Sequence, residues 1–144
     1  MTPDEERKVA VTLFNRVWEL MEKDPRTPEQ NDELIHAAHA SRYHWGNVGE
    51  PANFARGEWQ CSRMYTVLGR AESALWHAQR CLEICAQHDL GDWDLAYAYE
   101  ALARAHAIEG EHVESARFLE LARSVEIAER DDREHLLGDL ETIG

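Results

Sequence analysis

Basic residues, cysteine, glycine and proline are all scarce in this chain of 144 residues. Against 28 Asp and Glu there are only 15 Lys and Arg, which gives a formal net charge of −13. This charge disfavours attraction to phosphate backbones and anionic membranes, so we expect neither nucleic acid nor a membrane as a partner. The longest uncharged apolar runs are far shorter than a membrane span. Residues 1–6 also lack a basic region followed by an apolar core, so we expect no secretory signal.

The cysteine pattern argues against a disulfide framework. Cys61, Cys81 and Cys85 are odd in number and lack the paired spacings of disulfide scaffolds or zinc ribbons. We therefore expect reduced thiols and a cytoplasmic location. Cys81 and Cys85 lie four residues apart on an apolar stripe, a pattern that favours small, buried, weakly hydrophobic side chains.

Motifs for catalysis are missing as well. The sequence has no Gly-x-Ser-x-Gly elbow and no glycine-rich loop that would bind phosphate. Carboxylates are numerous, but an acidic helical protein carries them on its exposed helix faces in any case. We therefore expect a protein that is not an enzyme and holds no cofactor.

The pattern that is present is helical. The 4 Pro and 8 Gly fall at intervals of roughly twenty residues, and between them apolar residues recur every three or four positions. This predicts an all-α protein of about seven helices without a sheet. The expected helices run from Pro3 to before Asp24, from about 28 to 45, from near 54 to 69, and then over about 71–88, 92–108, 111–130 and 132–142.

Two helix starts have the residues of a capping box. Thr2 is followed by Pro3 and Glu5, and Thr27 is followed by Pro28 and Gln30. A Thr side chain in this position accepts from the third helical amide, while the Glu or Gln side chain accepts from the Thr amide. For the later helices we expect Asp92 and either Asp131 or Asp132 as N-caps, since aspartate is favoured there.

One stretch of sequence occurs twice. Residues 68–74 and 108–116 each close a helix with glycine and open the next with a Glu-Ser-Ala run. The two glycines, Gly69 and Gly110, are 110 − 69 = 41 residues apart. A repeat of this length that contains two helices is typical of helical repeat proteins.

These residues resemble the tetratricopeptide repeat (TPR) family. In the second unit the matching positions are Tyr99, Leu102, Ala103, Gly110, Ser115, Leu119 and Ala122, and in the first unit Tyr65, Gly69, Ala74, Ala78 and Cys81. Some positions depart from the pattern: His106 stands where an aromatic residue is expected, Trp59 falls one place late, and Cys61 and Ser62 replace the Leu and small pair. The period exceeds the usual ~34 residues and is similar to the longer repeats of kinesin light chain.

The resemblance implies a single domain in which antiparallel helical hairpins stack as a short right-handed α-solenoid. We place TPR-like units at 53–87 and 94–129, a degenerate N-terminal hairpin at 1–48, and a solvating cap helix at 131–143. In this family the first helix of each hairpin lines a concave groove. The predicted function is therefore a protein-protein interaction scaffold that binds a peptide or protein segment in that groove, including segments with acidic groups.

The resemblance also implies which side chains face the groove. The predicted peptide-binding residues are Arg56, Trp59, Gln60, Arg63, Tyr97, Glu100 and Arg104. Arg63 and Arg104 hold equivalent positions, and two recurring guanidinium groups would suit carboxylates. We accordingly expect that replacing both with Glu leaves melting almost unchanged. The competing interpretation is that Arg104 pairs with Glu100 four residues earlier and that Arg63 stacks on Trp59.

Two alternative functions stay open. Glu33, His36, His39 and His44 cluster on one predicted helix and offer ligands for a metal or groups for catalysis. The third hypothesis is self-assembly into a homo-oligomer, in which the exposed end of one array packs against another copy.

Overall fold

The computed structural model describes all 144 residues, which form seven α-helices and no β-strand. In chain order the helices are α1 (Pro3–Met21), α2 (Pro28–Val48), α3 (Pro51–Val67), α4 (Ala71–Gln87), α5 (Asp92–Ile108), α6 (His112–Ser124) and α7 (Arg130–Glu141). The predicted all-α class and number of helices are confirmed.

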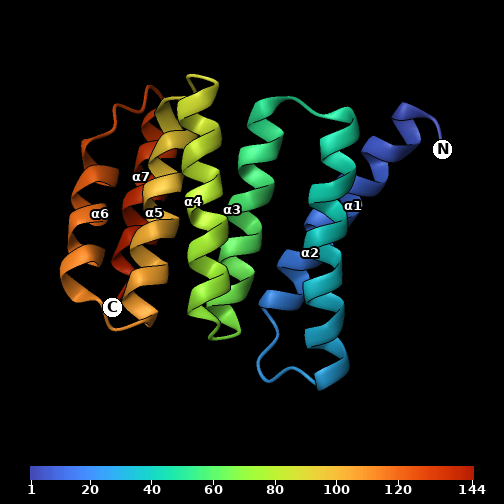
Figure 1. Cartoon of the computed structure of the whole chain (residues 1–144), viewed down its shortest axis with the longest axis horizontal. Coiled ribbons are helices and arrows are strands. Elements are labelled where there is room, and N and C mark those ends of the chain that lie inside the picture. The colour runs from blue at the N-terminus through green and yellow to red at the C-terminus, as the bar shows by residue number, and fades with distance from the viewer.

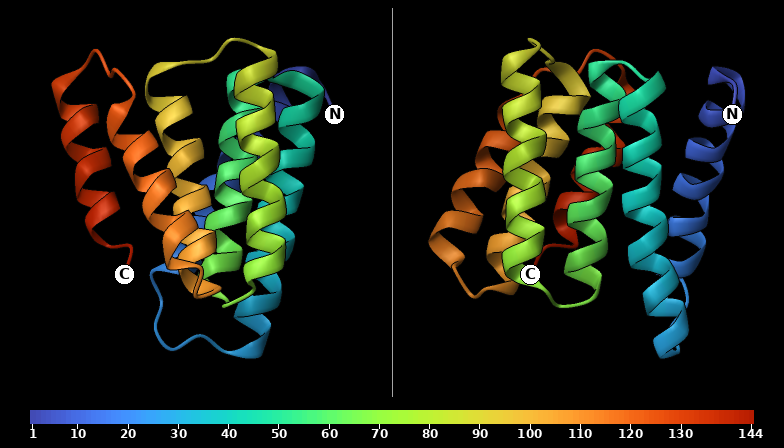
Figure 2. Two further views of the ribbon diagram at one scale, coloured as in Figure 1. Left: turned by 60° about the vertical axis from the view of Figure 1, so that its left-hand side comes forward. Right: turned by 45° about the vertical axis from the view of Figure 1, so that its right-hand side comes forward.

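Consecutive helices pack as antiparallel pairs, α1 with α2, α3 with α4 and α5 with α6 (Figure 1). The pairs follow one another in chain order, so that α1 lies at one end of the row and α6 and α7 lie at the other (Figure 2). The odd-numbered helices also contact each other in sequence, α1 with α3, α3 with α5 and α5 with α7. These contacts bring residues about forty positions apart in the sequence next to each other.

The second and third hairpins repeat the same local structure at a spacing of 41 residues. Helices α3 and α5 both have 17 residues, and their starts at Pro51 and Asp92 differ by 92 − 51 = 41. Gly69 and Gly110 end these hairpins' first helices with φ angles of +74° and +82°, a left-handed conformation that glycine adopts without strain. The sequence motif and the backbone conformation therefore recur at the same 41-residue spacing.

A buried hydrogen bond joins the two helices of each of these hairpins. The hydroxyl of Ser62 on α3 donates to the carbonyl of Ala74 on α4, at 2.8 Å. In the next hairpin the hydroxyl of Ser115 on α6 donates to the carbonyl of Ala103 on α5, at 2.9 Å. Both partners are displaced by 41 residues, since 103 − 62 and 115 − 74 give the same value. The serine donor lies on the first helix of one hairpin and on the second helix of the other, but the hydrogen bond joins equivalent positions in both.

Both predicted capping boxes are present. The Thr2 hydroxyl accepts from the amide of Glu5 at 3.1 Å, and the Glu5 carboxylate accepts from the Thr2 amide at 3.4 Å. Thr27 and Gln30 make the same two bonds at 3.1 and 2.9 Å. These bonds satisfy amides that have no partner inside their helices.

The predicted aspartate caps of α5 and α7 are wrong. Helix α5 is capped by Gly91 and α7 by Glu129, and neither cap uses a side-chain hydrogen bond. Asp92 is the first residue of α5, and its carboxylate accepts instead from the amide of Ala128, at 2.8 Å, in the connection between α6 and α7. The aspartate therefore ties two segments together rather than closing one helix end.

Helix α6 is shorter than predicted, because it ends at Ser124 and not near residue 130. Val125 adopts an extended conformation, with φ −71° and ψ 131°. Val125 and Ile127 then pack against the buried cluster that contains Tyr97 and Leu136. This extended segment partly buries the two apolar side chains.

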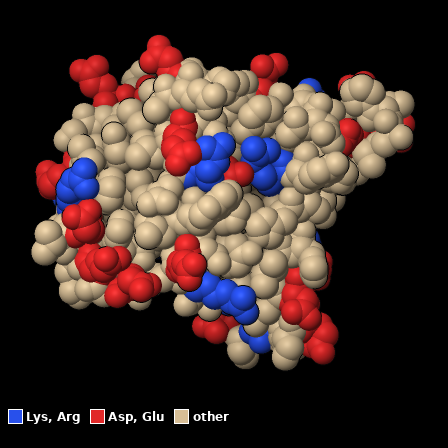
Figure 3. All heavy atoms as spheres, viewed as in Figure 1, with Lys and Arg blue, Asp and Glu red and all other residues tan.

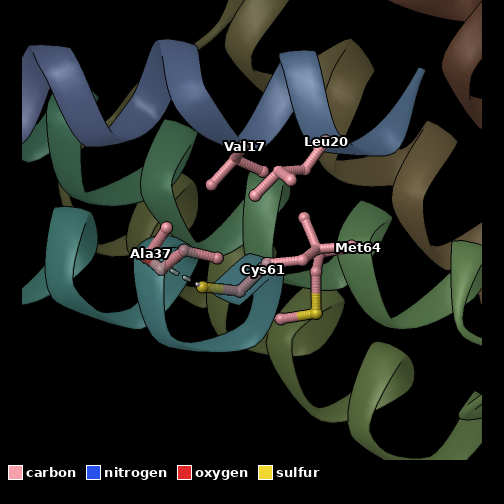
Figure 4. Packing of buried hydrophobic residues seen from close by; sticks show 7 residues of the cluster. Val17, Leu20, Ala37, Cys61 and Met64 are labelled. Carbon is pink, nitrogen blue, oxygen red and sulfur yellow. Dashed lines mark hydrogen bonds between the residues drawn. The ribbon is translucent and has the colours of Figure 1, made fainter. Parts of the chain in front are cut away.

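The core is a series of small clusters and not one large centre. In the cluster of Figure 4, Val17 and Leu20 of α1 face Ala37 of α2 and Cys61 and Met64 of α3. Burial of this kind contributes roughly 25 cal/mol per Å² of apolar surface. The other two thiols, on α4, belong to a second cluster, so the predicted packing role of Cys81 and Cys85 is confirmed.

The tryptophans do not all pack between helices. Trp76 on α4 is 57% exposed and lies outside every core cluster. Trp45 is partly buried beneath the guanidinium of Arg7, 5.7 Å from the ring centre.

None of the seven helices combines the length and the apolar character that crossing a bilayer requires.

Candidate functional site

The candidate site is a cleft formed mainly by the odd-numbered helices, which we call the aromatic cleft. It has a volume of about 400 Å³. Its lining residues are Phe14 and Trp18 of α1, Ala55, Arg56, Trp59 and Arg63 of α3, Cys81 of α4, Trp93, Asp94 and Tyr97 of α5, and His135 and Asp139 of α7. Five of the seven helices therefore contribute to one cavity.

The aromatic rings form a connected series through the cleft. The ring of Trp59 lies 5.4 Å from that of Trp18 and 5.4 Å from that of Tyr97, with the latter pair edge to face. Trp93 meets Tyr97 edge to face at 4.9 Å, and Phe14 meets Trp18 at 6.4 Å. Such contacts hold large flat side chains in fixed orientations.

Most polar groups around the cleft are paired within the chain. Arg56 donates two hydrogen bonds to Asp94, at 2.9 and 3.2 Å. The Tyr97 hydroxyl donates to Asp139 at 2.7 Å. Burial and this bond to a carboxylate raise the pKa of Tyr97. These pairs leave neither Arg56 nor Asp94 as an unmatched charge.

Beneath the cleft, two arginines share one carboxylate. Glu100 is fully buried, and its Oε2 lies 3.8 Å from Arg63 Nη1 and 3.6 Å from Arg104 Nε. Its Oε1 accepts a hydrogen bond from the indole of Trp59 at 3.2 Å. The Oε2 atom has no hydrogen-bond partner. The group therefore holds two positive charges against one negative charge.

Burial dominates the ionisation of this group. It raises the pKa of the Glu100 carboxyl, although the charges of Arg104 and Arg63 and the Trp59 bond oppose the rise. Burial likewise lowers the pKa of Arg104, against the opposing charge of Glu100. A fully buried carboxylate with long contacts gains too little from its partners to offset the loss of water.

Four of the seven predicted binding residues line the aromatic cleft: Arg56, Trp59, Arg63 and Tyr97. Gln60 does not, because it is buried and donates to the carbonyl of Phe14 at 2.9 Å. Glu100 lies beneath the cleft, fully buried. The helix register predicted the face correctly, but it did not predict how deep each side chain lies.

Arg104 is placed differently from Arg63, although their positions are equivalent in the repeat. Its side chain is 12% exposed, and it donates to the carbonyl of Asp139 at 3.2 Å and to the hydroxyl of Thr142 at 2.9 Å. The expected open pair of arginines is therefore not formed, because the end of α7 accepts hydrogen bonds from the second one. Replacing both arginines with Glu would place two further carboxylates beside the buried Glu100, so the double variant should melt at a lower temperature.

The local interpretation holds for one of the two arginines. Arg104 pairs with Glu100 four residues earlier, as that interpretation predicts. Arg63 does not stack on Trp59, since the cation–π contacts of this chain join Arg7 to Trp45, Arg42 to Phe54 and Arg117 to Phe118.

Sequence reasoning missed several lining residues. Trp18 and Trp93 are not among the predicted binding residues, and α7 was expected only as a solvating cap. The structure brings His135 and Asp139 of α7 into the cleft, with their side chains 3.4 Å apart. The four-residue spacings of Phe14 with Trp18 and of Trp93 with Tyr97 were the available signal, since such pairs share a helix face.

The residues of α2 that were kept open as alternative metal ligands do not come together. Glu33 accepts from Arg16 of α1, at 2.8 and 3.1 Å. His39 bonds the Tyr65 hydroxyl at 2.8 Å, and His44 bonds Glu6 at 2.8 Å. His36 is exposed. No group of three His, Cys, Asp or Glu side chains has the geometry to hold a metal ion.

A polar network between α2, α3 and α4 also bears on catalysis. Cys61 Sγ lies 4.0 Å from His39 Nδ1, an arrangement reminiscent of a nucleophile and its base. Burial, however, raises the pKa of the Cys61 thiol to about 12, and burial also lowers the pKa of His39. A thiol in this setting is not ionised near neutral pH and is a poor nucleophile.

A hollow of similar volume, about 420 Å³, lies outside the cleft, but the six residues that line it all belong to α4: Glu72, Ser73, Leu75, Trp76, His77 and Gln79. On the face viewed in Figure 3, basic side chains lie next to acidic ones and form no broad basic patch. A wider hollow of about 970 Å³ lies beside the connection between α6 and α7, but Asp92 on its wall is already bonded to Ala128.

Comparison with family models, curated proteins and solved structures finds no match for this chain.

Proposed function

We propose that this protein is a non-catalytic interaction module that binds a peptide or protein segment in the aromatic cleft. The observation that carries the proposal is the cleft itself, in which five aromatic side chains from three helices surround a cavity of about 400 Å³. Tyr and Trp are enriched at binding hot spots because they bury a large area with few rotatable bonds.

The proposed architecture is a short TPR-like solenoid. The 41-residue spacing of two hairpins supports it, as do the contacts of each odd-numbered helix with the next. In such an array each hairpin contacts only its neighbours, so the first helices leave an extended concave face. The proposal assigns the cleft to that face, because all but one of its lining residues belong to α1, α3, α5 and α7.

The dimensions favour anchoring side chains of an extended segment. A cavity of this volume is in the range of small-ligand pockets, which is about 300 to 1,000 Å³. It accommodates a few side chains and not a whole helix about 10 Å wide. The ligand we propose therefore inserts one or two side chains between the rings while its backbone crosses the odd-numbered helices.

The test is selection of random peptides by surface display on the purified protein, followed by affinity measurement with Trp18→Ala. Trp18 lines the cleft and contacts Trp59, so its loss removes one wall. We expect selected peptides to bind this variant at least about tenfold more weakly, since a hot-spot residue contributes about 2 kcal/mol or more.

The matched control is Trp76→Ala, because Trp76 is exposed on α4 and does not line the cleft. Circular dichroism and melting establish that both variants are folded. Peptides that lose affinity with Trp76→Ala and not with Trp18→Ala would place binding elsewhere and overturn the proposal, as would a selection that yields no binder.

A further inference from the structure

Arg63 differs from the other arginines of this chain in how its guanidinium is partnered. Thirteen of the 15 basic residues are Arg, and ten of them donate side-chain hydrogen bonds within the chain. The other three are Arg63, Arg70 and Arg133. Arg70 and Arg133 are exposed to water, whereas the Arg63 side chain is only 22% exposed.

The one charged contact of Arg63 is long. Its Nη1 lies 3.8 Å from Glu100 Oε2, which is beyond hydrogen-bond distance. Arg104 approaches the same oxygen at 3.6 Å, so one carboxylate faces two guanidinium groups. The guanidinium N–H groups of Arg63 therefore have no hydrogen-bond acceptor within the chain, and Arg63 is the member of the pair that lines the cleft.

The neighbouring carboxylates of Asp94 and Asp139 make no hydrogen bond to Arg63 and bond other side chains instead. Asp94 receives both of its hydrogen bonds from Arg56. Asp139 Oδ2 accepts from Tyr97 at 2.7 Å and lies 3.4 Å from His135. A partly buried guanidinium with free donors and aromatic neighbours is suited to a planar anion that accepts two parallel hydrogen bonds.

We propose that Arg63 is the anion subsite of the aromatic cleft and binds a carboxylate of the peptide, next to an apolar or aromatic side chain that inserts between the rings. This deepens the function proposed above and rests on it. The carboxylate belongs either to an Asp or Glu side chain or to a chain terminus. The net charge of −13 repels acidic ligands at long range, so binding strengthens with salt until screening also weakens the contact with Arg63.

The test uses three small probes and the full chain. Acetyl-Phe-Asp-amide carries a side-chain carboxylate, acetyl-Phe-Asn-amide is its neutral counterpart, and acetyl-Asn-Phe carries a terminal carboxylate. We expect at least one acid to bind about tenfold more tightly than the neutral probe, which is the effect of a charge-assisted hydrogen-bond pair. The stronger acid identifies the source of the carboxylate.

Variants assign the effect to Arg63. Arg63→Gln should abolish the preference for the acid, and Arg63→Lys should retain part of it because it keeps the charge without the planar fork. Arg70→Gln is the matched control, since Arg70 also lacks a partner but is exposed just after α3. The side-chain Nε–H signal of Arg63 in nuclear magnetic resonance spectra of the unmodified protein should shift with the acid probe, which needs no variant.

The inference is overturned if the neutral probe binds as well as both acids, or if folded Arg63→Gln and Arg63→Lys keep the full preference. Its failure is distinguishable from failure of the proposed function. Displayed peptides that depend on Trp18 but show no preference for acidic residues would leave the cleft as a binding site and remove only the role of Arg63. Absence of any binding, by probes and displayed peptides, would remove both.

Discussion

Two buried carboxylates, Glu58 and Glu100, differ in how completely their neighbours satisfy them. Both side chains are buried, with 7% of Glu58 and 0% of Glu100 exposed. Glu58 accepts from Arg42 at 2.7 Å and from His77 at 2.8 Å, one partner for each oxygen. Glu100 has one hydrogen bond, of 3.2 Å, and one oxygen with none.

The difference in partners changes the sign of the pKa shift. Burial acts to raise the pKa of Glu58, but the bond from His77 and the charge of Arg42 outweigh it, and the pKa falls below its ordinary value. For Glu100 burial wins and the pKa rises. The site with complete partners holds three helices together, and the incomplete site lies beneath the cleft. Geometry of the partners, and not the degree of burial alone, separates a structural carboxylate from one beside a binding surface.

The largest expected effect is at the complete site. Glu58→Ala removes both short bonds and leaves Arg42 without its carboxylate partner, so we expect unfolding free energy to fall by about 3 kcal/mol. Urea denaturation followed by circular dichroism measures this loss. A loss below about 1 kcal/mol would show that the Glu58 network contributes little and that the contrast with Glu100 is not energetic.

The second prediction contrasts the pH dependence of the two sites. Because the pKa of folded Glu58 is lowered, its stabilisation is present above the ordinary glutamate value and is lost as pH falls below it. Because the pKa of folded Glu100 is raised, the protein loses stability as pH rises from the ordinary value through the raised one.

Thermal melting of Glu58→Gln, Glu100→Gln and the unmodified chain tests these two opposite pH dependences. The pH should run from below the lowered pKa of Glu58 to above the raised pKa of Glu100. The advantage of the unmodified chain over Glu58→Gln should shrink on acidification, whereas its stability relative to Glu100→Gln should increase. Parallel curves for both variants would contradict the opposite shifts.

The third prediction separates the two arginines that share Glu100. Arg104→Gln removes hydrogen bonds to Asp139 and Thr142 that hold the end of α7, so it should cost about 1 to 2 kcal/mol. Arg63→Gln removes no hydrogen bond and should cost about 0.5 kcal/mol or less. Equal losses in chemical denaturation would mean that the two positions are equivalent after all.

The fourth prediction concerns the repeated hydrogen bond between hairpin helices. Ser62→Ala and Ser115→Ala each remove one buried bond of similar length, so each should cost about 1 kcal/mol. Similar losses in denaturation experiments would support the equivalence of the two hairpins. A loss confined to one of them would show that the 41-residue spacing repeats the backbone without repeating the energetics.

Local sequence signals account for most of the fold. The capping residues at Thr2 and Thr27 act over three positions, and the glycines at 69 and 110 act within one turn, so sequence alone predicts those helix ends. The end of α6 was mispredicted because burial of Val125 depends on residues far along the chain. Boundaries set by tertiary packing carry no local signature.

The candidate site was predictable only in part for the same reason. Helical spacing predicts that Arg56, Trp59 and Arg63 share a face, and the structure places all three in the cleft. Spacing cannot predict that α7 engages Arg104, since that contact joins positions 35 and 38 residues apart. The same limit concealed the contribution of α1, whose hairpin does not follow the 41-residue spacing.

The central claim is that ligand binds on the face of the odd-numbered helices, and the five tryptophans test it most directly. Each gives one indole N–H signal in a nitrogen-15 correlation spectrum. On addition of a peptide selected by display, we predict that the signals of Trp18, Trp59 and Trp93, which line the cleft, shift while those of Trp45 and Trp76 stay in place. Shifts of Trp45 or Trp76 with the three cleft signals unmoved would contradict the account.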